Sequence, residues 1–104
     1  MNRLFAALLL SLVSITFVST AALADAANGE KLARRWCADC HVVARDQSRG
    51  NTQAAPFSAI AKRPGIDAAK IALYLLLPHP KMPDMNLTRD EAADLTAYIV
   101  SQDR

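Results

Sequence analysis

The 104-residue sequence is poor in the residues that many metal and nucleic-acid sites require. Its two cysteines exclude a four-cysteine zinc site, and its two histidines, His41 and His79, lack the spacing of a Cys2His2 site. Basic and acidic residues nearly balance, at 12 Lys and Arg against 10 Asp and Glu, so nothing indicates a nucleic-acid partner. No internal repeat is present. These scarcities leave a small protein whose chemistry depends on few side chains.

The longest apolar run is also too short to cross a membrane. Residues 4–18 are apolar except for three hydroxyl residues, whereas a span needs about 20 apolar residues. Asn2 and Arg3 precede this run, and Ala22-Leu23-Ala24 follows it as a cleavage pattern, which together are typical of a secretory signal peptide. We expect a cleaved signal peptide over residues 1–24, with an uncleaved anchor as the alternative. The remainder, residues 25–104, is predicted to form one domain.

That domain has about 80 residues, a size at which the hydrophobic core is marginal without disulfides, a metal or a cofactor. Both cysteines fall in one motif, Cys37-Ala38-Asp39-Cys40-His41, and C-x-x-C-H is the attachment signature of a c-type haem. The two thiols can bond the vinyl groups of one porphyrin, and His41 can then ligate the iron. A thioredoxin-like pair would need a βαβ context, and no strand-like segment surrounds the motif. A structural disulfide here would close too small a loop to stabilise a fold.

The rest of the chain reads as all-α. Apolar spacing predicts a helix over 29–39 with Asn28 as its cap, and a short helical turn over 57–62. Asp67 is expected to cap a helix that ends at Leu77, before prolines at 78 and 80. Thr88 and Glu91 form a capping box that opens a helix to about residue 102. Segments 42–55 and 78–86 are expected to be loops.

An iron bound by His41 also needs a ligand on its other face. Methionine is attractive because its thioether favours iron(II) and raises the reduction potential. Within residues 25–104 the only methionines are Met82 and Met85, both in the proline-rich loop. Prolines on either side of Met82 would hold that loop rigid. We expect Met82 as the sixth ligand, with Met85, His79 and an open site as the alternatives.

At this point the chain resembles the class I cytochrome c family, in particular its small exported bacterial members with one haem. Gly29, eight residues before Cys37, matches a family glycine that lets the N-terminal helix cross the C-terminal helix closely. Leu95 and Tyr98 match the partner positions on the C-terminal helix. The resemblance implies a cytochrome c-like fold, with three to four short helices wrapped around one haem c bonded through Cys37 and Cys40.

The resemblance also implies roles for three further residues. Pro56 looks like the family proline whose carbonyl accepts the Nδ1 proton of the axial histidine. Tyr74 looks like the tyrosine whose hydroxyl hydrogen-bonds the methionine sulfur, although an ordinary amphipathic role would explain it as well. Arg63 stands near the position of an arginine that binds a haem propionate. In the same way, Met82-Pro83 matches the family's methionine better than Met85.

We therefore expect a periplasmic one-electron carrier of a Gram-negative bacterium rather than an enzyme. It would act as a monomer on transient redox protein partners, without nucleic acid and without a membrane span after signal cleavage. Two alternatives remain: a dedicated haem subunit of a larger periplasmic oxidoreductase, and a haem sensor or enzyme with an open sixth site.

Overall fold

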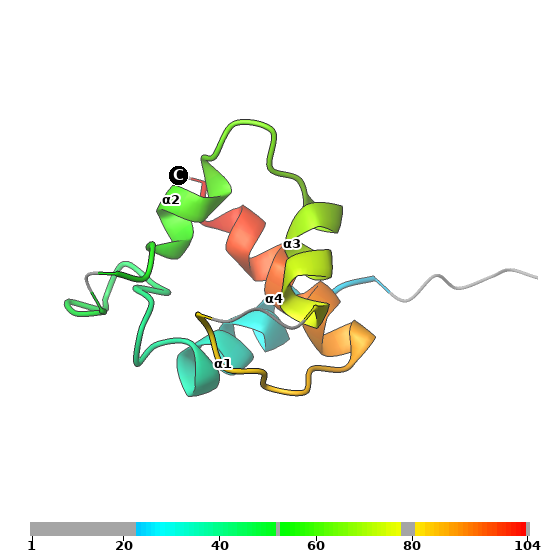
Figure 1. Cartoon of the computed structure of the whole chain (residues 1–104), viewed down its shortest axis with the longest axis horizontal. Coiled ribbons are helices and arrows are strands. Elements are labelled where there is room, and N and C mark those ends of the chain that lie inside the picture. The colour runs from blue at the N-terminus through cyan, green and yellow to red at the C-terminus, as the bar shows by residue number, and fades with distance from the viewer. Residues whose placement is uncertain (1–22, 52, 78–80, 104) are drawn as a thin grey trace, which may run out of the picture.

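A computed structural model describes residues 23–51, 53–77 and 81–103 of the chain. The predicted signal peptide, apart from Leu23 and Ala24, lies outside these ranges, as does His79. The described residues form four helices and no strand: α1 (Ala26–Trp36), α2 (Phe57–Ala61), α3 (Ala68–Leu76) and α4 (Arg89–Ser101) (Figure 1). The prediction of an all-α chain is confirmed.

The first helix begins earlier than the sequence predicted. Asp25 is its N-cap, and one carboxylate oxygen accepts hydrogen bonds from the backbone N–H groups of Ala27, at 2.9 Å, and Asn28, at 3.1 Å. The expectation that Asn28 caps this helix is therefore wrong, because Asp25 already satisfies the free N–H groups of the first turn. The Asn28 side chain instead donates to the carboxylate of Asp94 in α4, at 2.8 Å. This bond ties α1 to α4.

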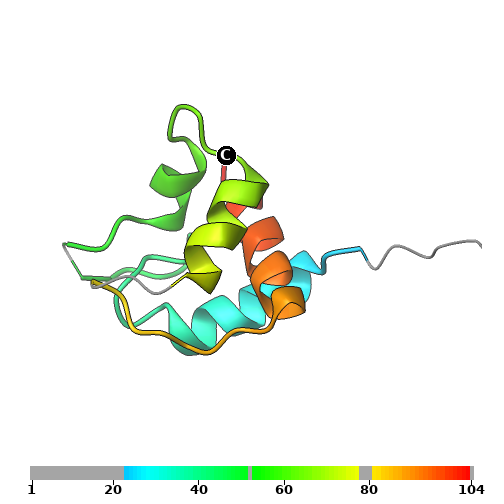
Figure 2. The same cartoon turned by 45° about the vertical axis from the view of Figure 1, so that its right-hand side comes forward.

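Helices α1 and α4 pack against each other (Figure 2), and Gly29 lies where they approach most closely. A Cβ atom on Gly29 would lie 2.0 Å from the carbonyl oxygen of Asp94 and 2.9 Å from the Cβ of Tyr98. No side chain can occupy that position at this separation, so the absence of a Cβ sets how closely the helices approach. The close crossing expected from the family resemblance is confirmed.

The C-terminal helix is central, because α1, α2 and α3 all pack against it. Its start carries the predicted capping box: Thr88 Oγ1 accepts from Glu91 N–H at 3.1 Å, and the Glu91 carboxylate accepts from Thr88 N–H at 2.9 Å. Leu95 and Ile99 are almost fully buried, at 1% and 3% exposure, and form the core together with Phe57 and residues of α1 and α3.

The third helix begins where predicted, since the Asp67 carboxylate accepts from Lys70 N–H at 2.8 Å. Its buried residue Ile71 belongs to the core, and the half-buried Leu75 packs against that core. After α3 the chain returns as an extended segment, 81–88, which passes beside the C-terminal end of α1 before α4 begins (Figures 1 and 2). Within the described ranges, none of the helices has the length and apolarity that a membrane crossing requires.

Candidate haem site

The C-x-x-C-H motif folds as a tight turn directly after α1. Cys37 is the C-cap of the helix, and its carbonyl accepts from the N–H groups of Cys40, at 3.1 Å, and His41, at 2.8 Å. These bonds wind residues 37–41 into a single turn, so the two cysteines and the histidine belong to one compact unit. The predicted helix to residue 39 stops at Trp36 because the chain tightens here.

The two thiols of this turn differ in their surroundings. Cys37 is buried, at 8% exposure, whereas Cys40 is exposed, and neither forms a disulfide. Burial raises the pKa of the Cys37 thiol to about 11, and the neighbouring Cys40 adds to the rise. The Cys37 side chain is therefore held as a neutral thiol against the core until it is converted to a thioether.

The histidine ring is oriented by a backbone carbonyl. His41 Nδ1 lies 2.6 Å from the carbonyl oxygen of Ala55, across the loop that follows the motif. A proton on Nδ1 satisfies this oxygen and leaves Nε2 as the nitrogen that is free for a metal. Such a bond also raises the basicity of the ring as a ligand.

The acceptor differs from the expected one. The resemblance implied the carbonyl of Pro56, whereas the structure brings the carbonyl of Ala55, one residue earlier, to His41 Nδ1. Pro56 is the N-cap of α2, and its carbonyl already accepts from the N–H groups of Ala59 and Ile60, both at 3.0 Å. Pro56 still has a role in the geometry, since a proline favours an extended conformation in the residue before it, here Ala55.

Phe57 is a further site residue that the sequence reasoning missed. Its ring lies against the imidazole of His41, with centroids 5.4 Å apart, and edge-on to Tyr98, at 6.3 Å. The Tyr98 hydroxyl donates to the carbonyl of Val43, just beyond the motif, at 2.7 Å. Phe57 and Tyr98 thus connect the histidine to α4. The signal available in the sequence was an aromatic residue directly after Pro56.

The other predicted residues are placed less decisively. Met82 and Met85 are both half-buried in segment 81–88, so burial does not choose between them. Tyr74 lies on α3 with 57% of its surface exposed, and Arg63 is exposed just after α2. His79 lies outside the described residues. The roles of Met82, Tyr74 and Arg63 therefore stay predictions.

One helix of the fold exposes an apolar surface that suits a porphyrin. A soluble helix normally exposes polar residues, yet α3 and its C-cap expose four large side chains at 42–57%: Leu73, Tyr74, Leu76 and Leu77. The hydrophobic core leaves this surface uncovered, and an apolar macrocycle could cover part of it. The donor set also fits, since two thiols and one imidazole with a free Nε2 are the groups that a c-type haem requires.

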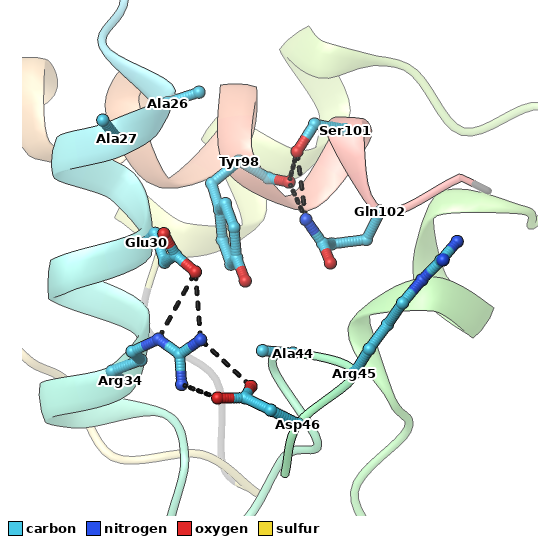
Figure 3. A pocket seen from close by; sticks show the side chains of 10 residues that line it. All are labelled: Ala26, Ala27, Glu30, Arg34, Ala44, Arg45, Asp46, Tyr98, Ser101 and Gln102. Carbon is cyan, nitrogen blue, oxygen red and sulfur yellow. Dashed lines mark hydrogen bonds and ion pairs between the residues drawn. The ribbon is translucent and has the colours of Figure 1, made fainter.

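A separate hollow of about 480 Å³ lies between α1, the end of α4 and the loop after the motif (Figure 3). Arg34 lies at its edge, within 3.0 Å of the Glu30 carboxylate and 3.1 Å of the Asp46 carboxylate. This charged lining does not suit a porphyrin. The hollow is therefore distinct from the haem site, and the Arg34–Asp46 ion pair fastens the loop to α1.

Comparisons with known proteins agree with this site. The family model described as Cytochrome c matches residues 26–103. The chain is 49% identical over 83 residues to a protein named Cytochrome c-552 from Bradyrhizobium diazoefficiens, and this match covers 80% of each of the two chains. No solved structure matches. The chain therefore belongs to the cytochrome c family, whose members bond haem c through two cysteines, here Cys37 and Cys40, and transfer electrons rather than catalyse a reaction.

Proposed function

We propose that this protein is an exported, monomeric one-electron carrier of the periplasm, with His41 and Met82 as the axial ligands of its haem iron. The observation that carries the proposal is the His41 ring, whose Nδ1 is bonded to the Ala55 carbonyl and whose Nε2 remains available. When bound, the haem supplies an iron that changes between two oxidation states.

The residues of the chain supply the rest. Cys37 and Cys40 hold the porphyrin covalently, and His41 orients it through a ring restrained by Ala55 and Phe57. The exposed leucines of α3 would exclude water from one side. Because none of these groups must move for an electron to enter or leave, the site favours electron transfer over substrate chemistry.

Met82 is preferred to Met85 because it stands between Pro80 and Pro83, and a rigid segment loses little conformational entropy when its sulfur binds iron. Met85 lies next to Asn86, whose φ of 51° turns the chain. In this proposal, Tyr74 donates to the Met82 sulfur and Arg63 contacts a propionate.

Visible and near-infrared spectra of the holoprotein test the ligand. The wild type and Met85→Ala should show the weak sulfur-to-iron charge-transfer band, and Met82→Ala should lose it and bind carbon monoxide rapidly when reduced. A band that survives in Met82→Ala would refute the assignment. Rapid carbon monoxide binding by the wild type would instead favour a sensor or enzyme with an open sixth site.

Export is tested separately by cell fractionation and by the mass of the purified protein. We expect haem-loaded protein in the periplasmic fraction, and we expect its polypeptide to begin at Asp25. A cytoplasmic holoprotein that retains residues 1–24 would contradict this part of the proposal and leave the ligand assignment unaffected.

A further inference from the structure

One uncharged side chain in the loop after the motif makes an unusual set of bonds with the backbone around His41. The carboxamide oxygen of Gln47 accepts from Val43 N–H at 2.9 Å. Its nitrogen lies 2.9 Å from the Ala38 carbonyl, 2.8 Å from the His41 carbonyl and 2.7 Å from the Arg49 carbonyl. A single amide therefore reaches both sides of the C-x-x-C-H turn.

The partners also settle which end of the amide is which. Three of them are carbonyl oxygens and one is an N–H group, so only the orientation with nitrogen toward the carbonyls satisfies all four. An NH2 group has two protons for these three oxygens, which means that one N–H is shared. The arrangement demands an amide in particular, because a carboxylate would place an oxygen against three carbonyls.

We propose that Gln47 is a positioning residue for the axial histidine, which it holds by clamping the backbone of the haem attachment turn. This inference rests on the proposed function, in which His41 ligates the iron. His41 is then held at three points: its N–H by the Cys37 carbonyl, its carbonyl by Gln47, and its ring by the Ala55 carbonyl. Only Nε2 remains for the metal.

The loop that carries Gln47 is itself fastened on both sides. The preceding residue, Asp46, is paired with Arg34 of α1 (Figure 3). On the other side, a Cβ on Gly50 would lie 2.9 Å from the Cys40 carbonyl, and Asn51 N–H donates to that same carbonyl at 2.6 Å. The amide is thus held by a loop that cannot recede from the motif without breaking these contacts.

The clamp has a consequence for the iron. The backbone of His41 is held by Gln47, whereas its ring is held by Ala55 from the far end of the loop. If the backbone shifts, the Nδ1 to oxygen distance must lengthen or the ring must turn. A weaker bond at Nδ1 makes the imidazole a poorer donor to iron(III), so the reduction potential should rise.

Two variants of the holoprotein test the proposal. Gln47→Leu keeps the size of the side chain and removes all four bonds, and Gln47→Asn keeps the amide but shortens its reach. Both should have a higher reduction potential than the wild type, and a different pattern of haem-methyl NMR shifts in the ferric state, because that pattern depends on the plane of the axial imidazole. Ser48→Ala, an uncharged change at the next position, should alter neither measurement.

The outcomes are separable. A wild-type spectrum without histidine ligation would overturn the proposed function itself. If the wild type is histidine-ligated and both variants keep its potential and shift pattern, Gln47 is an ordinary loop residue and the inference fails, even when thermal stability drops.

Should both variants fail to retain haem, the wild-type holoprotein still decides the matter. The side-chain NH2 protons of Gln47 should exchange with solvent at least about ten times more slowly than the side-chain NH2 protons of the exposed Gln53. The backbone N–H of Val43 should likewise exchange at least about ten times more slowly than the backbone N–H of Gln53. Exchange of the Gln47 protons at the rate of Gln53 would refute the clamp.

Discussion

Replacing Gly29 with alanine tests whether the crossing of α1 and α4 depends on the missing Cβ. The added methyl carbon would lie 2.0 Å from the Asp94 carbonyl oxygen and 2.6 Å from its carbonyl carbon. Since carbon-to-oxygen contacts seldom fall below about 3.3 Å, the helices must separate by more than about 1 Å. That movement strains the Asn28 to Asp94 bond and pulls Tyr98 from the Val43 carbonyl.

Two opposing effects set the magnitude. Alanine favours a helix over glycine by about 1 kcal/mol. Forcing an extra carbon into a packed contact costs about 1–3 kcal/mol, and we take about 3 kcal/mol here because backbone atoms must give way. The net loss is about 2 kcal/mol, which for a domain of this size lowers the melting temperature by roughly 8–16 °C.

Thermal unfolding of the holoprotein, followed by circular dichroism, measures the effect. The matched controls are Lys31→Ala and Lys31→Gly, since Lys31 is an exposed position in the same helix and an added or removed Cβ there meets no neighbouring helix. Lys31→Gly should melt below Lys31→Ala by about 4–8 °C, which reports helix propensity alone. If Gly29→Ala melts at or above the wild type, propensity outweighs packing and the crossing does not require a glycine.

Three further predictions concern other parts of the molecule. Thr96 is 4% exposed and its hydroxyl has no partner among the described residues, so Thr96→Val should stabilise the protein by about 1 kcal/mol in urea unfolding, whereas a loss would reveal a hidden partner. Arg34 holds the pKa of Asp46 below its ordinary value, so the stability that Asp46 contributes exists above pH about 4 and is lost as the pH falls through the lowered pKa. The difference in urea midpoint between wild type and Asp46→Asn should therefore shrink between pH 6 and pH 3, and a constant difference would contradict the pairing. Gly50→Ala places a Cβ 2.9 Å from the Cys40 carbonyl, and should cost about 1–3 kcal/mol in urea unfolding; unchanged stability would show that the motif turn yields freely.

Local signals in the sequence account for most of the helices. The cap at Asp67 and the capping box at Thr88 each depend on a side-chain oxygen that accepts from the backbone N–H three residues later, and both form as predicted. The start of α1 was missed, because Asp25 and Asn28 are both good caps and the spacing of apolar residues does not distinguish them.

The sequence by itself determined the chemistry: two thiols and a histidine in five residues, in a domain whose core is marginal without a cofactor. Only the tertiary structure decided what holds that histidine. The acceptor is Ala55 rather than Pro56, and the clamp is Gln47. The physical reason is that these bonds are accepted by backbone carbonyls. Every residue has a backbone carbonyl, so the residue type does not indicate which carbonyl accepts the bond. The family resemblance predicted the close crossing at Gly29, whereas the Asp94 carbonyl as its nearest contact depends on how the two helices meet, which neither helix encodes alone.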